Sequence, residues 1–160
     1  MRHIPTEQDG RIALRDHVIA KAACARARHG PCIDTGAIAG VLLDRDAVRY
    51  PVCIVFDAGS LQPGEFAHVE SLGEHPGDGY RLVIHPCLGR REQALPMVIA
   101  YYIAVINYGE IATSDECEQF GATLLGLDVE TYYRALCDLA DSPAIAGGGA
   151  CDGDLPPKGP

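Results

Sequence analysis

The sequence predicts an α+β domain in which a small sheet packs on a buried central helix. Helical periodicity dominates residues 6–43 and 95–140, and short strand-like runs fill the stretch between them. Residues 95–106 are almost entirely apolar, and a helix that is apolar on every side belongs in the interior of a fold. The 160 residues and 17.0 kDa suit one domain, which can bury a sizeable core without disulfides or metal.

Two helices open the chain. Thr6 followed three residues later by Asp9 predicts the start of the first helix, and Gly30 with the proline after it predicts the end. Asp34 is a good N-cap for a shorter second helix that runs to Leu43.

Three strands are expected in the middle of the chain, over residues 52–56, 66–72 and 80–85. The first is an apolar run closed by turn residues, and the second alternates loosely. Residues 73–79 contain three glycines and one proline, which predicts a turn. Because the connections are short, we expect a small antiparallel sheet.

The last part of the domain is expected to be helical. After the apolar helix, Ser114 and Asp128 are the expected N-caps of two further helices. The residues from 143 to 160 are rich in glycine and proline and offer little to bury, so they are expected to be a disordered tail. The domain itself is expected to span residues 1–142.

The charge is unevenly distributed. The chain carries 13 Lys and Arg against 22 Asp and Glu, a net charge of −9. Residues 1–50 hold 8 basic and 6 acidic side chains (+2), and residues 51–160 hold 5 and 16 (−11). Nucleic-acid binders usually carry a basic face, so no direct nucleic-acid binding is expected. The acidic part favours a cationic partner surface.

Seven cysteines occur without a Cys-x-x-Cys motif, and the number is odd. A secreted disulfide framework would be denser and even in number, so reduced and mostly buried thiols are expected. No signal peptide is expected at the N-terminus, and the stretch from Leu95 to Ile106 is too short to span a membrane. These features favour a cytoplasmic protein. The oligomeric state does not follow from them.

Four segments, in this order along the chain, are similar to motifs of one peptidase family. They are Pro31-Cys32-Ile33-Asp34 before the second helix, Arg81–His85 in the last strand, Arg90-Arg91 before the central helix, and Glu116–Leu125 in the helix after it. With the order of elements, they resemble the ImmA/IrrE family of zincin-like metallopeptidases over about residues 10–140. The resemblance implies a zincin-like fold and a regulatory role, since family members commonly act on helix-turn-helix repressors in phage, mobile-element or stress circuits.

The chain departs from that family at the catalytic motif. The family carries His-Glu-x-x-His on its active helix, which places two zinc ligands and a general base on one face. Here the corresponding residues are Tyr101, Tyr102 and Val105. Only Glu116 matches a zinc ligand of the family, so the resemblance implies a pseudoenzyme with no catalytic residues and no cofactor.

The resemblance also implies an inherited cleft that binds a protein partner. Its expected lining residues are Tyr101, Tyr102, Val105, Glu116 and His85. Tyr101 either lines this cleft or fills the vacated metal site with its hydroxyl within reach of Glu116. A related possibility is a mobile-element protein whose acidic half blocks a DNA-binding partner.

A second hypothesis from the residues is a metal-dependent hydrolase with a relocated zinc site. His68 and Glu70 stand two residues apart, as do His85 and Cys87. Residues i and i+2 of a strand share a face, so the right register would bring the four ligands together. The alternative is that His68 and Glu70 face solvent and His85 ends a strand.

Overall fold

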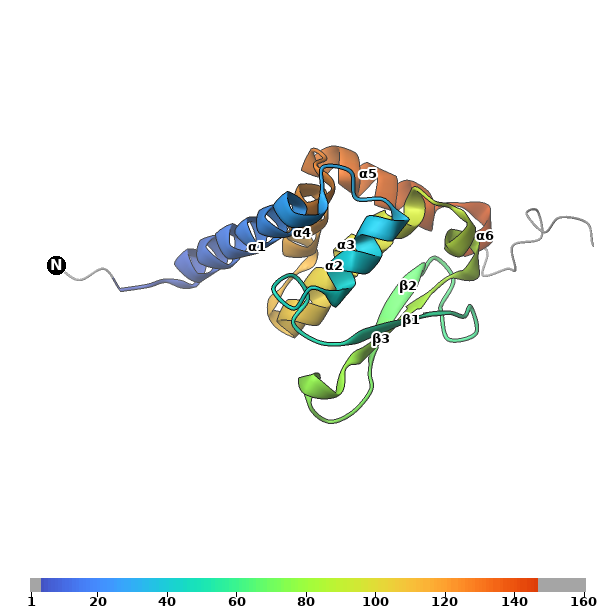
Figure 1. Ribbon diagram of the computed structural model, residues 1–160, viewed down its shortest axis with the longest axis horizontal. Helices are drawn as coiled ribbons and strands as arrows, with labels where there is room; N and C mark the ends of the chain where they lie inside the picture. Colours follow the sequence, from blue (N-terminus) through green and yellow to red (C-terminus); the bar gives the residue numbers. More distant parts are fainter. Residues whose placement is uncertain (1–3, 147–160) are drawn as a thin grey trace, which may run out of the picture.

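The computed structural model describes residues 4–146 and places a three-stranded sheet against one side of a group of helices (Figure 1). The helices are α1 (Glu7–His29), α2 (Thr35–Leu43), α3 (Ala94–Tyr108), α4 (Ser114–Leu125), α5 (Val129–Ala140) and α6 (Pro143–Ala146). The strands are β1 (Val52–Phe56), β2 (Ala67–Ser71) and β3 (Tyr80–Ile84), and short 3₁₀ turns include η1 (Pro76–Asp78), η2 (Pro86–Arg90) and η3 (Gly109–Ile111). The predicted α+β class is confirmed.

The sheet is mixed, so the prediction of an antiparallel sheet is wrong. Its order is β1-β3-β2, with β3 in the centre. β2 and β3 form the predicted antiparallel hairpin, in which Val69 faces Leu82. β1 runs parallel to β3, with Ile54 opposite Leu82. The β2–β3 hairpin places β3 between β1 and β2, so that β1 and β3 become parallel neighbours. The short connections between successive strands do not indicate this order.

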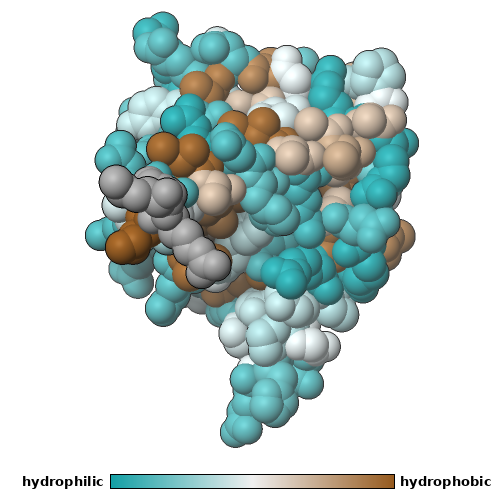
Figure 2. Space-filling view, turned by 90° about the vertical axis from the view of Figure 1, so that its left-hand side faces the viewer, coloured by the Kyte–Doolittle hydropathy of each residue, from teal (hydrophilic) through white to brown (hydrophobic). Residues whose placement is uncertain are grey.

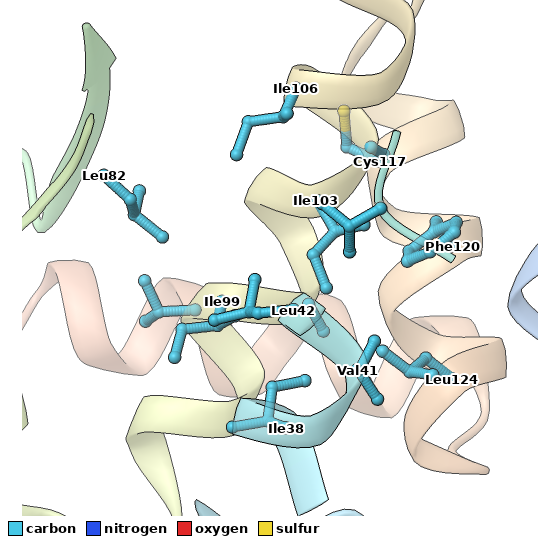
Figure 3. Packing of buried hydrophobic residues seen from close by; sticks show 14 of the residues in the cluster. Ile38, Val41, Leu42, Leu82, Ile99, Ile103, Ile106, Cys117, Phe120 and Leu124 are labelled. Atoms are coloured by element: carbon cyan, nitrogen blue, oxygen red, sulfur yellow. The ribbon is translucent and has the colours of Figure 1, made fainter. Parts of the chain in front are cut away.

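The central helix is α3, as predicted. Eleven of its fifteen residues are buried. Figure 3 shows its isoleucines between Leu82 of β3 on one side and Phe120 and Leu124 of α4 on another. By its length and its apolar composition alone, the segment Ala94–Ile111 could cross a membrane, but most of it is buried inside this fold. A core helix passes the same test.

The helix N-termini follow the predicted caps with one exception. The reciprocal capping box of Thr6 and Asp9 is present at α1, and the Asp34 side chain accepts a hydrogen bond from a backbone N–H of α2. At α4 the N-cap is Thr113, and Ser114 is the first helical residue. The prediction is wrong there because Thr113 pairs with Glu116 in a capping box, a stronger arrangement than a serine alone.

The folded domain extends four residues beyond its predicted end. Residues 143–146, expected to be part of a disordered tail, form α6, and Ile145 is only 1% exposed. The N–H of Gly64 donates to the carbonyl of Ile145, which ties α6 to the loop before β2. The remainder of the predicted tail, residues 147–160, lies outside the described residues.

The expectation of reduced, mostly buried thiols is wrong in two respects: Cys87 is disulfide-bonded, and three free cysteines are exposed. Cys24 on α1, Cys32 before α2 and Cys53 on β1 are exposed, whereas Cys117 is buried. Cys53 lies in an apolar run that suggested a core strand, but β1 is at the edge of the sheet. Edge position rather than local hydrophobicity decides its exposure.

Candidate functional site

One stripe of α3 is left half buried. Met97, Tyr101, Tyr102 and Val105 are the four residues of this helix that the core does not enclose. Residues four apart lie one above another on a helix, so Met97, Tyr101 and Val105 follow one line. Tyr102 stands beside that line, with its ring centroid 5.2 Å from that of Tyr101. The stripe therefore contains three of the five residues predicted for the binding cleft.

The stripe lies next to the open edge of β2. The carbonyl of Phe66 and the N–H of Leu72, which flank the strand, both bond to the chain flanking β3. Backbone groups alternate in direction along a strand of an antiparallel pair. The N–H and C=O groups of Ala67, Val69 and Ser71 therefore point away from β3, toward the open edge.

Tyr102 joins α3 to this edge. Its hydroxyl donates a hydrogen bond of 2.7 Å to the carbonyl of Ala67, and its ring meets that of Phe66 at a centroid distance of 6.4 Å. Burial raises the pKa of Tyr102, so the hydroxyl stays protonated and acts as a donor. We call Tyr101, Tyr102 and the edge residues Ala67 and Val69 the β2-edge site.

The charge of Glu118, and not that of Glu116, contributes to the raised pKa of Tyr101. Burial raises the pKa of Tyr101 to about 12, and the nearby acidic groups of Cys117 and Glu118 add to the shift. The pKa of Glu118 is itself raised by burial and by Asp115.

Glu116 serves as a helix cap. It is 4% exposed, and its carboxylate accepts hydrogen bonds from the N–H (2.9 Å) and the hydroxyl of Thr113. Its other oxygen lies 3.1 Å from a guanidinium nitrogen of Arg11 on α1. Glu116 is thus directed at α1 and its own helix end. The prediction that it lines a common cleft with the tyrosines is not supported.

His85 is also engaged locally. It is 4% exposed, its ring Nδ1 accepts from the N–H of Cys87 at 3.2 Å, and its own N–H donates to the carbonyl of Phe66. These contacts make it the N-cap of η2. Its backbone supports the strand that carries the β2-edge site, while its ring caps the following turn.

The relocated zinc site is only partly assembled. His68 and Glu70 do share a face of β2, but both ring nitrogens of His68 lie 3.0 Å from carboxylates, Nδ1 from Glu65 and Nε2 from Glu70. Arg81 approaches the second oxygen of Glu70 at 3.3 Å. Within residues 4–146, no three His, Cys, Asp or Glu side chains are grouped closely enough to hold a metal ion.

We expect the His68 network to give a pH-dependent contribution to stability. The hydrogen bond that the His68 ring donates to the Glu65 carboxylate is the largest cause that raises the pKa of His68, so protonation favours the folded state. The contribution is full below the unfolded pKa of about 6.5 and is lost as the pH rises through the folded pKa. It should stay below about 1 kcal/mol, because the carboxylates are well exposed.

Urea unfolding of His68→Gln and of the parent chain at pH 6 and pH 9 measures this contribution. The variant should lose more stability at pH 6 than at pH 9. His75→Gln, in the exposed turn before η1, is the matched control. An equal loss at both pH values would show that His68 does not carry a protonation-linked interaction.

A groove of about 770 Å³ meets the half-buried stripe at Met97. It lies between residues 31–36, the start of α3 and the α4–α5 connection, and its wall is more apolar than polar. Leu127 on its rim is 40% exposed. Because Met97 lines the groove and lies one helical turn from Tyr101, the groove and the β2-edge site are neighbouring parts of one surface of α3.

A second hollow, of about 430 Å³, lies between α1 and α4 and includes Arg11, Arg15 and Glu116. Figure 2 views the end of the molecule where α1 begins and shows apolar atoms scattered among polar ones on that face. The lining is mostly charged or amide side chains, and Glu116 is already paired there. This hollow offers less apolar contact than the groove at Met97.

No protein-family model matches the sequence, and comparisons with curated proteins and with solved structures also give no match. The resemblance to the ImmA/IrrE peptidases therefore stays a prediction. Sequence reasoning missed Met97, Ala67 and Val69. The four-residue spacing of Met97, Tyr101 and Val105 was the available signal for the first, whereas the open edge of β2 depends on the strand order.

Proposed function

We propose that this chain is a non-catalytic regulatory domain of the zincin-like, ImmA/IrrE type that binds an extended segment of a protein partner. The observation that carries the proposal is the juxtaposition of the half-buried stripe of α3 with an open strand edge. The resemblance favours a helix-turn-helix repressor as the partner, and the cytoplasm is the compartment that the sequence features favour.

The β2 edge has what strand addition needs. Val69 presents its N–H and C=O outward, and an incoming strand can form main-chain hydrogen bonds with both. Tyr101 lies against Tyr102, whose hydroxyl bonds to that edge, and it offers an aromatic surface at low conformational cost. Because the carbonyl of Ala67 already accepts a hydrogen bond from Tyr102, the added strand would be centred on Val69.

The chemistry of the surroundings favours a cationic segment. The carboxylates of Glu65 and Glu70 lie at the two ring nitrogens of His68 on β2, next to the edge. The part of the chain from 51 to 160 carries a net charge of −11. Basic residues on the partner would complement these carboxylates and speed its encounter.

The function that we propose is non-catalytic because α3 lacks the residues of the family's catalytic motif. Tyr101, Tyr102 and Val105 supply neither the paired imidazoles nor the carboxylate base of the family's catalytic motif. We make no second proposal for a zinc hydrolase at His68, Glu70, His85 and Cys87. The ring of His68 is engaged by two carboxylates, and no observation favours that function.

A randomised peptide display library selected on the full chain tests the binding site. Selected peptides should bind the parent protein and lose at least tenfold in affinity with Tyr101→Leu, which keeps an apolar side chain. Tyr133→Leu, on the exposed face of α5, is the matched control and should bind normally. In ¹⁵N-resolved spectra the largest shifts should fall on Ala67, Val69 and Ser71. Equal binding by Tyr101→Leu, or shifts elsewhere, would contradict the proposed site.

Two measurements, of peptide cleavage and of bound zinc, test the non-catalytic part of the proposed function separately from binding. The bound peptides should remain intact, with and without added zinc. Protein purified without an affinity tag should hold less than about a tenth of an equivalent of zinc, since established zinc sites retain metal tightly. Peptide cleavage or near-stoichiometric zinc would overturn the non-catalytic assignment without affecting the evidence for binding.

A further inference from the structure

β1 is an apolar edge strand in which no side chain is buried. Its sequence is Val-Cys-Ile-Val-Phe, and its residues are only intermediate or exposed. Val55 is 36% exposed and Phe56 is 46% exposed. Sheet edges are normally protected by charges, prolines, bulges or covering segments, because an open edge pairs readily with another strand. The five residues of β1 contain no charge and no proline.

The backbone of β1 is available for pairing. The carbonyl of Pro51 and the N–H of Asp57, at the two ends of the strand, bond to the chain of β3. Alternate residues of a strand direct their backbone groups to opposite sides. The N–H and C=O groups of Val52, Ile54 and Phe56 therefore point to the open edge.

We propose that β1 pairs with β1 of a second copy of this chain. A two-fold axis requires antiparallel strands, and an axis at Ile54 places Val52 opposite Phe56 and Cys53 opposite Val55 of the second copy. Every facing pair is then apolar. The two sheets join into one six-stranded sheet, and the exposed side chains of each strand gain an apolar cross-strand neighbour.

The charges that flank β1 are complementary in this arrangement. Arg49 precedes the strand and Asp57 follows it, and both are exposed. Antiparallel pairing about Ile54 places Asp57 of each copy opposite Pro51 of the other, two residues from Arg49, whereas parallel pairing would oppose like charges. β2 is less suited to self-pairing, because Glu70 would approach its own copy and Tyr102 occupies the carbonyl of Ala67.

Sedimentation of the full chain across a concentration series tests the proposal. The average mass should rise with concentration from 17.0 kDa toward twice that value. Val55→Glu places like charges near each other at the paired edge and should weaken association at least tenfold. Leu72→Glu, at another exposed apolar position after β2, is the matched control and should not. A constant monomer mass, or equal association by Val55→Glu, would overturn the proposal.

Charge reversal and hydrogen exchange test the pairing of β1 without relying on whether Val55→Glu folds. Arg49→Glu should weaken association, and adding Asp57→Lys should restore it. The amides of Ile54 and Phe56 should become protected from exchange as the concentration rises. Failure of the double variant to recover, with no change at these amides, would contradict pairing through β1. Neither measurement involves the β2-edge site, so failure here leaves the proposed function intact.

Discussion

Gly121→Ala should destabilise the domain by about 2–4 kcal/mol, the upper range for overpacking a core. Gly121 lies on α4 against Tyr132 of α5, which is fully buried. A Cβ at this position would stand 2.2 Å from the Tyr132 hydroxyl and 2.3 Å from Cζ of its ring. The ring has little room to move, because its hydroxyl donates to the carbonyl of Met97 at 2.6 Å.

Chemical denaturation of the variant and of a double variant tests this contact. Tyr132→Leu shortens the side chain, so Gly121→Ala should cost much less in that background than in the parent chain. Gly10→Ala is the control: a Cβ there meets nothing within 4 Å, and alanine should stabilise α1 by about 0.5–1 kcal/mol. Additive losses at positions 121 and 132 would show that the two residues are not coupled.

The Tyr132 contact also supports the α3 surface. Tyr132, Ala122 and Leu136 form a small buried cluster, and Tyr101 and Met97 pack against it. The groove and the β2-edge site thus rest on the α4–α5 pair. The absence of a Cβ at position 121 leaves the space in which the ring of Tyr132 reaches α3.

Local patterns predicted the elements of this fold but not their pairing. The apolar stretch of α3 is buried, and the caps at Thr6 and Asp34 are where the sequence placed them, because both depend on neighbouring residues. The parallel pairing of β1 with β3 depends on which strand enters between the others. That choice is non-local, and turn residues between successive strands carry no information about it.

The same distinction applies to the site. Tyr101 and Tyr102 lie together on α3, since adjacent residues on a helix cannot be separated. Glu116 is directed elsewhere, although the resemblance placed it with the tyrosines. The sequence Thr113-Ser114-Asp115-Glu116 already held the capping-box pattern that accounts for Glu116. Because Glu116 already had a capping partner in its own helix end, it was a weaker candidate for the cleft than Tyr101 or Tyr102.

Glu116→Gln should cost about 1–2 kcal/mol at pH 7, because it keeps the capping acceptor but replaces charged hydrogen bonds by neutral ones and removes the ion pair with Arg11. Burial opposes ionisation of Glu116, but the hydrogen bonds from Thr113 and the charge of Arg11 together lower its pKa. A lowered pKa stabilises the fold above the unfolded value of about 4.3, and the contribution is lost as the pH falls through the folded pKa. The difference between the parent and the variant should therefore shrink in acid.

Denaturation at pH 7 and pH 3, combined with peptide binding, separates the two roles considered for this residue. As a cap, Glu116 affects stability and leaves the affinity of the folded protein for β2-edge peptides unchanged. Glu110→Gln, in the exposed turn after α3, is the control and should change stability by less than about 0.5 kcal/mol. A stable Glu116→Gln protein that no longer binds peptide would assign Glu116 to the binding surface, and with it the cleft that the resemblance implies.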